Sequence, residues 1–194
     1  GIFAETLQCE RHGQEPCGTC HSCIQSESGN QPDIIWVHHE KPGSIGVDDV
    51  REQVIGDMQI KPYSSRYKIY IIDEAEKLTQ QAQNALLKTI EEPPAYGIII
   101  LLTTNADTFL QTILSRCVRL DFRPLRDTLV TQYLQEKYDL TDYECRFATA
   151  FAQGKIGRAV TIATSKEFAQ LKEEVMHVIR YAKEMTTAEI MAEV

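Results

Sequence analysis

The feature that most constrains the fold is a strand–helix–strand pattern in residues 67–103. Residues 67–72 (YKIYII) and 97–103 (GIIILLT) are almost continuously apolar, which is typical of strands buried on both faces. Between them, apolar side chains recur at helical spacing, after a possible helix cap at Thr79 and before the Pro93-Pro94 pair. Strands joined by a crossover helix are parallel neighbours, so the pattern predicts an α/β fold with a parallel sheet.

Further elements are expected on both sides of this unit. Residues 1–8 have the pattern of a helix end, and an apolar helical spacing begins at Val47 behind Gly46. The short apolar runs 34–37 and 118–122 predict two more strands of the sheet. Residues 1–124 are therefore expected to form an α/β domain.

After Pro124 the pattern changes from β-branched runs to helical periodicity. Thr141 and Glu144 have the spacing of a capping box, and Gly154 can end the helix that they begin. We expect residues 125–194 to form a small helical domain.

Four of the six cysteines lie close together, at Cys9, Cys17, Cys20 and Cys23, with the spacing C-x7-C-x2-C-x2-C. Two residues between cysteines let both sulfur atoms face one point, as a tetrahedral metal requires. Four thiolates leave no open position, so the spacing predicts a structural zinc site rather than a catalytic one. A chance cluster of thiols and a redox C-x2-C pair are the alternatives; no strand leads directly into the cysteines, which disfavours the redox pair.

Composition excludes several classes of protein. The formal net charge is -8, whereas a protein that simply coats nucleic acid should be basic. No apolar run approaches the roughly 18 residues that a membrane helix needs, and the N-terminus has no signal-peptide pattern. We therefore expect a cytoplasmic protein in a reducing compartment, where clustered cysteines bind metal rather than form disulfides.

Three polar constellations follow the predicted strands. Asp73 and Glu74 end the first long strand, as magnesium-binding and water-polarising carboxylates do in nucleotide hydrolases, although any buried strand can end in an acidic turn. Asn105 follows the next strand and would lie beside them at the same sheet edge, unless it is only a turn residue. Arg116 precedes the last predicted strand and is either a solvated surface residue or an arginine finger. The phosphate-binding string G-x-x-x-x-G-K-[ST] does not occur in the sequence.

Taken together, these strings resemble the AAA+ clamp-loader subunits of bacterial DNA polymerase III. The resemblance is carried by YKIYIIDEAEKLTQQAQNALLKTIEEPP, then IIILLTTN, ILSRC and DFRPL, and by the four cysteines followed by NQPDI. It covers residues 1–124 with high specificity, and the helical remainder is compatible with the lid domain of the family. It implies an AAA+ sheet of the P-loop NTPase type with an inserted zinc knuckle at residues 9–23 and a C-terminal helical lid.

Two kinds of subunit in the family share these features. The ATP-hydrolysing motor subunit, gamma or tau, typically has an alanine- and asparagine-rich turn before G-V-D-D and a D-E-V-H string. Here the matching places read HHEKPGSIGVDD and D-E-A-E, which resemble the delta-prime kind more closely. The motor subunit is the alternative, and a free-standing zinc-ribbon module that binds nucleic acid is a third; the acidic charge balance disfavours the zinc ribbon.

The resemblance implies a role for particular residues. The four cysteines match zinc ligands, Asp73 and Glu74 match the Walker B pair, and Asn105 matches the sensor-1 position. Arg116 matches an arginine finger that acts on the ATP of a neighbouring subunit, and Arg158 lies near the sensor-2 position.

The resemblance also implies partners and a place in a larger machine. The partners would be the gamma/tau and delta subunits and, through the complex, the sliding clamp and primed DNA, within the DNA polymerase III holoenzyme, a nucleotidyltransferase. ATP and Mg²⁺ would act only in the assembled complex. In the family a central strand and the phosphate loop precede the helix matched by residues 1–8, and a collar domain follows the lid, so the sequence is expected to be a fragment. Either another segment fills the central place in the sheet, or residues 97–103 and 118–122 approach each other directly.

Overall fold

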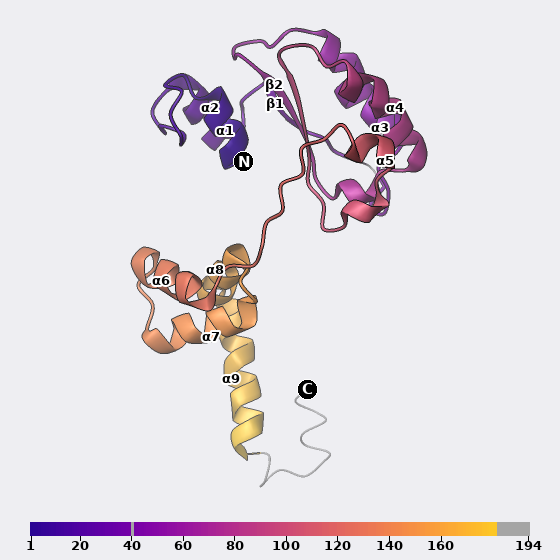
Figure 1. The fold of residues 1–194 in the computed structure, drawn as a ribbon. Helices are drawn as coiled ribbons and strands as arrows, with labels where there is room; N and C mark the ends of the chain where they lie inside the picture. Colours follow the sequence, from indigo (N-terminus) through magenta and orange to yellow (C-terminus); the bar gives the residue numbers. More distant parts are fainter. Residues whose placement is uncertain (40, 182–194) are drawn as a thin grey trace. The chain divides into compact units, whose positions relative to one another are not determined.

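The computed structural model describes residues 1–39 and 41–181. These residues belong to two compact units, which are divided between Arg119 and Leu120. We call them the N-terminal unit and the C-terminal unit (Figure 1).

The N-terminal unit is built around a parallel sheet of three strands, β1 (Ile34–Trp36), β2 (Lys68–Ile72) and β3 (Gly97–Leu101), in the order β1-β2-β3. Ile34 pairs with Ile69 across β1 and β2, and Tyr70 pairs with Ile99 across β2 and β3. Every residue of β2 is buried. The parallel sheet and its buried middle strand confirm the pattern predicted from residues 67–103.

The two faces of β2 are covered by different helices, α1 (Ile2–Gln8) on one face and α3 (Val47–Val50), α4 (Gln80–Glu91) and α5 (Gln111–Leu114) on the other (Figure 1). Side chains of Ile69 and Ile71 pack in a cluster with Ala4 of α1. Tyr70 and Ile72 belong to the larger cluster, which includes residues from α3, α4 and α5. The alternation of side chains along a strand therefore divides this unit into three layers.

The remaining short elements connect these layers. α2 (His21–Glu27) follows the cysteine-rich loop, and α3 continues into a π-helical segment, Arg51–Gly56, and a 3-10 turn, Asp57–Gln59. Two further 3-10 turns, Ala75–Lys77 and Ala106–Thr108, follow β2 and β3. The helix expected from Val47 is thus present, although only its first turn is regular α-helix.

The structure confirms the helix caps that the sequence predicted at Thr79 and Thr141. The hydroxyl of Thr79 accepts a hydrogen bond from the Ala82 amide at 3.2 Å, which begins α4. Thr141 and Glu144 form the reciprocal capping box of α7 (Asp142–Ala152). Each of these predictions depends on residues three positions apart, for which tertiary context matters little.

The strand expected at residues 118–122 is not formed. Val118, Leu120 and Phe122 are 89%, 68% and 93% exposed, and the described part of the chain pairs no strand with this segment. A β-rich run becomes a strand only when a neighbouring backbone accepts and donates its ladder hydrogen bonds. The sequence left two arrangements open: another segment fills the central place in the sheet, or residues 118–122 pair directly with β3. Neither is present among the described residues, because β3 is an edge strand of the sheet.

The C-terminal unit is helical and comprises α6 (Asp127–Lys137), α7, α8 (Ile156–Thr164) and α9 (Lys166–Tyr181). Its core consists of small and branched side chains from the first three of these helices: Val130, Leu134, Cys145, Ala148, Ala152 and Ala159. Residues 182–194 of the expected helical domain lie outside the described residues. Within the described ranges, no helix is long and apolar enough to cross a membrane.

Gly154 fixes the end of α7. Gln153 and Gly154 both have a left-handed backbone, with φ of 52° and 73°. A Cβ atom at position 154 would lie 2.5 Å from the carbonyl oxygen of Leu125, whose amide donates to the Gly154 carbonyl at 2.9 Å. The position thus requires glycine both for its conformation and for the close approach of the chain that enters α6.

We predict that Gly154→Ala destabilises the C-terminal unit by about 2 kcal/mol or more, because alanine is strained at positive φ and its Cβ would overlap backbone atoms. The matched control is Gly157→Ala in α8, where a Cβ would meet nothing within 4 Å. The control should be neutral or up to about 1 kcal/mol more stable. Urea unfolding followed by circular dichroism measures both changes, and equal effects of the two substitutions would contradict this role of Gly154.

Candidate functional site

The cysteine cluster (Cys9, Cys17, Cys20 and Cys23) comes together in the N-terminal unit. The four sulfur atoms all lie within 4.8 Å of one another, and the Cys17 and Cys23 sulfurs are 4.0 Å apart. The chain from α1 delivers Cys9, and the first turn of α2 delivers Cys23. The spacing seen in the sequence therefore does bring all four thiols to one point.

Backbone amides donate hydrogen bonds to the sulfur atoms in sequence. The Cys17 amide donates to Cys9 Sγ at 3.4 Å, the Cys20 amide to Cys17 Sγ at 3.3 Å, and the Cys23 amide to Cys20 Sγ at 3.4 Å. Such bonds stabilise thiolates, the form in which cysteine binds metal.

The thiols differ in how readily they ionise. Hydrogen bonds from the Thr19 amide and hydroxyl lower the pKa of Cys17 to about 6. Amides of Cys17 and Arg11 lower the pKa of Cys9, whereas burial and the Cys20 side chain raise the pKa of Cys23 to about 12. Metal binding at this cluster must therefore displace a proton from Cys23.

The donor set fits zinc. Tetrahedral Zn–S bonds of about 2.3 Å place sulfur atoms about 3.8 Å from one another, close to the separations in the cluster. Four sulfur ligands complete the tetrahedron, so a zinc ion held by Cys9, Cys17, Cys20 and Cys23 would be structural: it would cross-link the loop without binding substrate.

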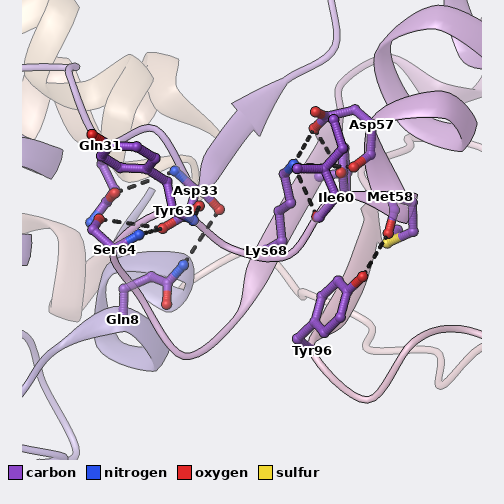
Figure 2. A network of polar contacts seen from close by, with 11 residues as sticks. Gln8, Gln31, Asp33, Asp57, Met58, Ile60, Tyr63, Ser64, Lys68 and Tyr96 are labelled. Carbon is purple, nitrogen blue, oxygen red and sulfur yellow. Dashed lines mark hydrogen bonds and ion pairs between the residues drawn. The ribbon is translucent and has the colours of Figure 1, made fainter.

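Polar side chains attach the cysteine-rich segment to the sheet (Figure 2). Gln8, the last residue of α1, donates from Nε2 to the carbonyl of Tyr67 at 2.6 Å and to that of Asp33 at 3.4 Å. The carboxylate of Asp33 accepts from the amides of Tyr63, Ser64 and Ser65 at 2.6, 2.8 and 2.8 Å. The turn that leads into β2 is thereby fixed to the segment that precedes β1.

A buried lysine anchors the other side of β2 (Figure 2). Lys68 Nζ forms an ion pair with Asp57 at 2.8 Å and donates to the carbonyls of Asp57 and Ile60. Tyr70 donates to the same carboxylate at 2.8 Å. A buried ammonium requires a paired charge, so Lys68 keeps the 3-10 turn after the π-helical segment against the sheet.

The polar residues after β2 and β3 meet at one sheet edge. The Ala75 amide donates to the carbonyl of Leu102 at 2.8 Å, and Thr104 donates to Glu76 at 2.8 Å. The pKa of Glu76 is lowered by two hydrogen bonds to its carboxylate, first from its own backbone amide and then from the Thr104 hydroxyl. Asp73, Glu74 and Asn105 therefore lie at the carboxyl ends of neighbouring parallel strands, where ligand sites in such sheets are found.

These edge residues are already engaged within the chain. Asp73 accepts from the Glu74 amide at 2.9 Å, and Glu74 forms an ion pair with Lys77 at 2.6 Å. Lys77 also donates to the Pro42 carbonyl at 2.8 Å. Asn105 accepts from the Asp107 amide at 3.1 Å and caps the 3-10 turn after it. In this arrangement the Glu74 carboxylate is paired with the Lys77 ammonium.

The two arginines singled out by the sequence have different surroundings. Arg116 forms an ion pair with Glu91 at the end of α4, at 2.9 Å, and donates to the Thr112 carbonyl at 2.9 Å. Its side chain keeps 39% of its surface exposed. Arg158 lies in the first turn of α8 in the C-terminal unit and is exposed.

Sequence reasoning missed the residues that connect these parts. Gln8, Asp33 and Glu91 interact with residues 25 to 59 positions away in the sequence. Among these connecting residues, Lys68 is the one that the sequence could have indicated, because a lysine within an otherwise apolar strand requires a buried partner.

The backbone defines the class of the protein. Its fold is similar to that of a RuvB mutant from Thermotoga maritima, with a TM-score of 0.51 over 89% of this chain and 55% of that one, at 13% sequence identity. At that identity the likeness concerns the fold alone, and the fold is AAA+-like. The cysteine cluster and the C-terminal helices accompany it, as the sequence predicted.

Sequence comparisons assign the family. The family described as DNA polymerase III, delta subunit matches residues 1–126. The chain is 32% identical to the delta-prime subunit of Bacillus subtilis over 90% of its length, and 36% identical to the tau/gamma subunit of Haemophilus influenzae over 83%. The chain therefore belongs to the DNA polymerase III clamp-loader subunits of the delta-prime, gamma and tau kind. It spans 52% of the Bacillus relative and 24% of the Haemophilus one.

We predict that the purified protein carries one zinc ion per chain under reducing conditions, because four cysteine sulfur atoms are already gathered at one point for it. Cys17→Ser should lower the zinc content well below one, whereas Cys117→Ser, an exposed cysteine outside the cluster, should not change it. Elemental analysis of the three proteins measures this. Chelation should increase hydrogen exchange in residues 9–30 while the sheet stays protected, because β2 has its own buried core. A wild-type protein with little zinc, or equal loss in both variants, would contradict the assignment.

Proposed function

We propose that the chain is part of a clamp-loader subunit of the delta-prime kind, which acts in the cytoplasm. It would assist the ATP-driven loading of the sliding clamp onto primed DNA, together with gamma/tau and delta subunits. Residues 1–124 would supply the AAA+ domain with its zinc knuckle, and residues 125–194 the helical lid. In this proposal ATP and Mg²⁺ are bound by the assembled complex.

The observation that carries the proposal is the state of the sheet edge. Glu74 is paired with Lys77, Asp73 accepts from the Glu74 amide, and Asn105 caps the 3-10 turn that follows it. ATP hydrolysis needs a carboxylate that orients water and a loop that holds the phosphates. The G-x-x-x-x-G-K-[ST] string that holds the phosphates in such sites does not occur within residues 1–194.

Two sequence features favour delta-prime over the motor subunit. The turn P-G-S-I-G at residues 42–46 and the D-E-A-E string at 73–76 resemble delta-prime subunits more closely. The match to a delta-prime relative also extends over 90% of the chain. The motor subunit remains the second candidate, because a tau/gamma relative reaches 36% identity.

Arg116 would act in trans, on ATP held by a neighbouring subunit. Its guanidinium is partly exposed, and its carboxylate partner Glu91 is 44% exposed. A phosphate oxygen can take the place of a carboxylate oxygen on the same guanidinium. An ion pair this exposed contributes about 1 kcal/mol or less, so the exchange would cost little.

We predict that the 194-residue chain does not hydrolyse ATP. Carboxylates and Mg²⁺ alone do not position a triphosphate for attack. A coupled phosphate-release assay with Mg²⁺ and ATP should give the rate of the buffer. Turnover that Glu74→Gln abolishes would show a working site in this chain.

A second prediction distinguishes an arginine finger from an arginine that only stabilises its own loop. Arg116→Ala should lower the ATPase of the reconstituted clamp loader several-fold, less than the roughly 10³–10⁵ that such fingers contribute elsewhere, since other sites continue to turn over. Glu91→Gln is the matched control, because it removes the same ion pair but keeps the cation. It should leave the ATPase nearly unchanged, and the melting temperature of both variants should stay near that of the wild type.

If Arg116 only fixes its own loop, the two substitutions will have equal effects. They would then lower the melting temperature of the subunit together and leave the ATPase of the complex unchanged, which would overturn the finger assignment.

A further inference from the structure

A cavity of about 290 Å³ lies between the cysteine-rich segment and the turn that precedes β2. Its walls come from three places in the sequence: the loop around His12, the start of α2 at His21 and Ser22, and the turn at Ser65 and Arg66. Its volume is at the lower end of the range of about 300–1,000 Å³ for ligand sites. The cavity belongs to the N-terminal unit and is separate from the sheet edge at Asp73.

The walls are held in place before any ligand arrives. Gln31 donates from Nε2 to Ser22 Oγ at 2.8 Å and to Ser65 Oγ at 3.2 Å, so one amide connects the α2 wall with the turn wall. Asp33 fixes the turn itself through its bond to the Ser65 amide, and its own amide donates to Gln31 Oε1 at 3.3 Å. Groups fixed in this way lose little conformational entropy on binding.

Hydrogen-bond donors without acceptors line the cavity. Because Ser22 and Ser65 accept from Gln31, their own hydroxyl protons are left to donate, and the described residues offer neither of them an acceptor within hydrogen-bond distance. Ser22 is only 5% exposed, so partners outside the chain reach it through the cavity. In addition, every imidazole carries at least one N–H group, and the rings of His12 and His21, which line the cavity, form no hydrogen bond with the described residues.

The lining carries one permanent positive charge, at Arg66, and one carboxylate, at Glu10. The Arg66 guanidinium lies over the Tyr67 ring, 5.1 Å from its centre, and has no carboxylate partner in the described ranges. Glu10 is the one carboxylate of the lining, and its Oε1 accepts from the Ser22 amide at 3.4 Å. Gln25 Oε1 is buried without a donor, which a ligand with both acceptor oxygens and a hydroxyl proton would satisfy.

We propose that this cavity binds a phosphate group. Donors that converge from three walls match the tetrahedral oxygens of phosphate, and a guanidinium is the side chain best suited to bind them. The two serine hydroxyls and the Arg66 guanidinium present protons rather than lone pairs, so they suit an anion better than a metal cation. The phosphate can belong to a nucleic-acid backbone or be free in solution, and both offer the same chemistry to the cavity.

The test uses the full-length, zinc-loaded protein and begins with inorganic phosphate at constant ionic strength. Amide resonances of Ser22, Ser65 and Arg66 should shift saturably, and Arg66→Gln should weaken binding about tenfold or more. Arg51→Gln is the matched control, since Arg51 is an exposed arginine outside the cavity, 3.9 Å from Asp48. It should leave the affinity unchanged.

A second arm identifies the source of the phosphate. The affinity for a primed oligonucleotide is measured against salt concentration for the wild type and for Arg66→Gln. A slope of log K against log salt that falls by about one in the variant supports a nucleic-acid phosphate. An unchanged slope with intact binding of inorganic phosphate supports a free phosphate instead. The absence of saturable shifts at these residues, or equal affinity in wild type and Arg66→Gln, overturns the proposal.

Discussion

The burial of β2 on both faces is the constraint on which the N-terminal unit depends. Ile69 and Ile71 require a cover on one side, and Tyr70 and Ile72 require one on the other. α1 supplies the first cover and thereby carries the cysteine cluster to the sheet, while α4 and its neighbours supply the second. The acidic turn at Asp73 is placed by the same strand, so the candidate metal centre and the sheet edge share one scaffold.

Polar bridges add to the apolar packing of α1 in attaching the cysteine-rich segment to that scaffold. Gln8 and Gln31 each donate two hydrogen bonds, and Asp33 accepts from three consecutive amides. These bonds define the orientation of α2 and of the turn before β2, because hydrogen bonds are directional whereas apolar packing is not. A zinc ion at the cluster would hold the loop together, and the bridges would hold the loop to the sheet.

Local sequence patterns predicted many of the elements of this molecule, whereas contacts between residues far apart in the sequence could not be predicted from them. Thr79 and Gly154 were read correctly because a cap depends on its own helix, and the four cysteines were grouped correctly because their spacing is short. Residues 118–122 were wrongly expected to be a strand, since their apolar pattern does not reveal whether a partner strand lies beside them. The bond between Gln8 and Tyr67 spans 59 positions, which no local pattern encodes. The pairing of Arg116 with Glu91, across 25 positions, required the folded chain for the same reason.

Our central proposal is that the chain belongs to a clamp-loader subunit of the delta-prime kind. In this proposal Arg116 acts at the nucleotide site of a neighbouring subunit, and the subunit has no working nucleotide site itself. The most direct test is the binding of ATP by the full-length protein, measured by equilibrium dialysis with and without Mg²⁺. The delta-prime assignment predicts no tight, Mg²⁺-dependent binding. One tight, Mg²⁺-dependent site per chain would contradict it and place the protein with the gamma/tau motor subunits.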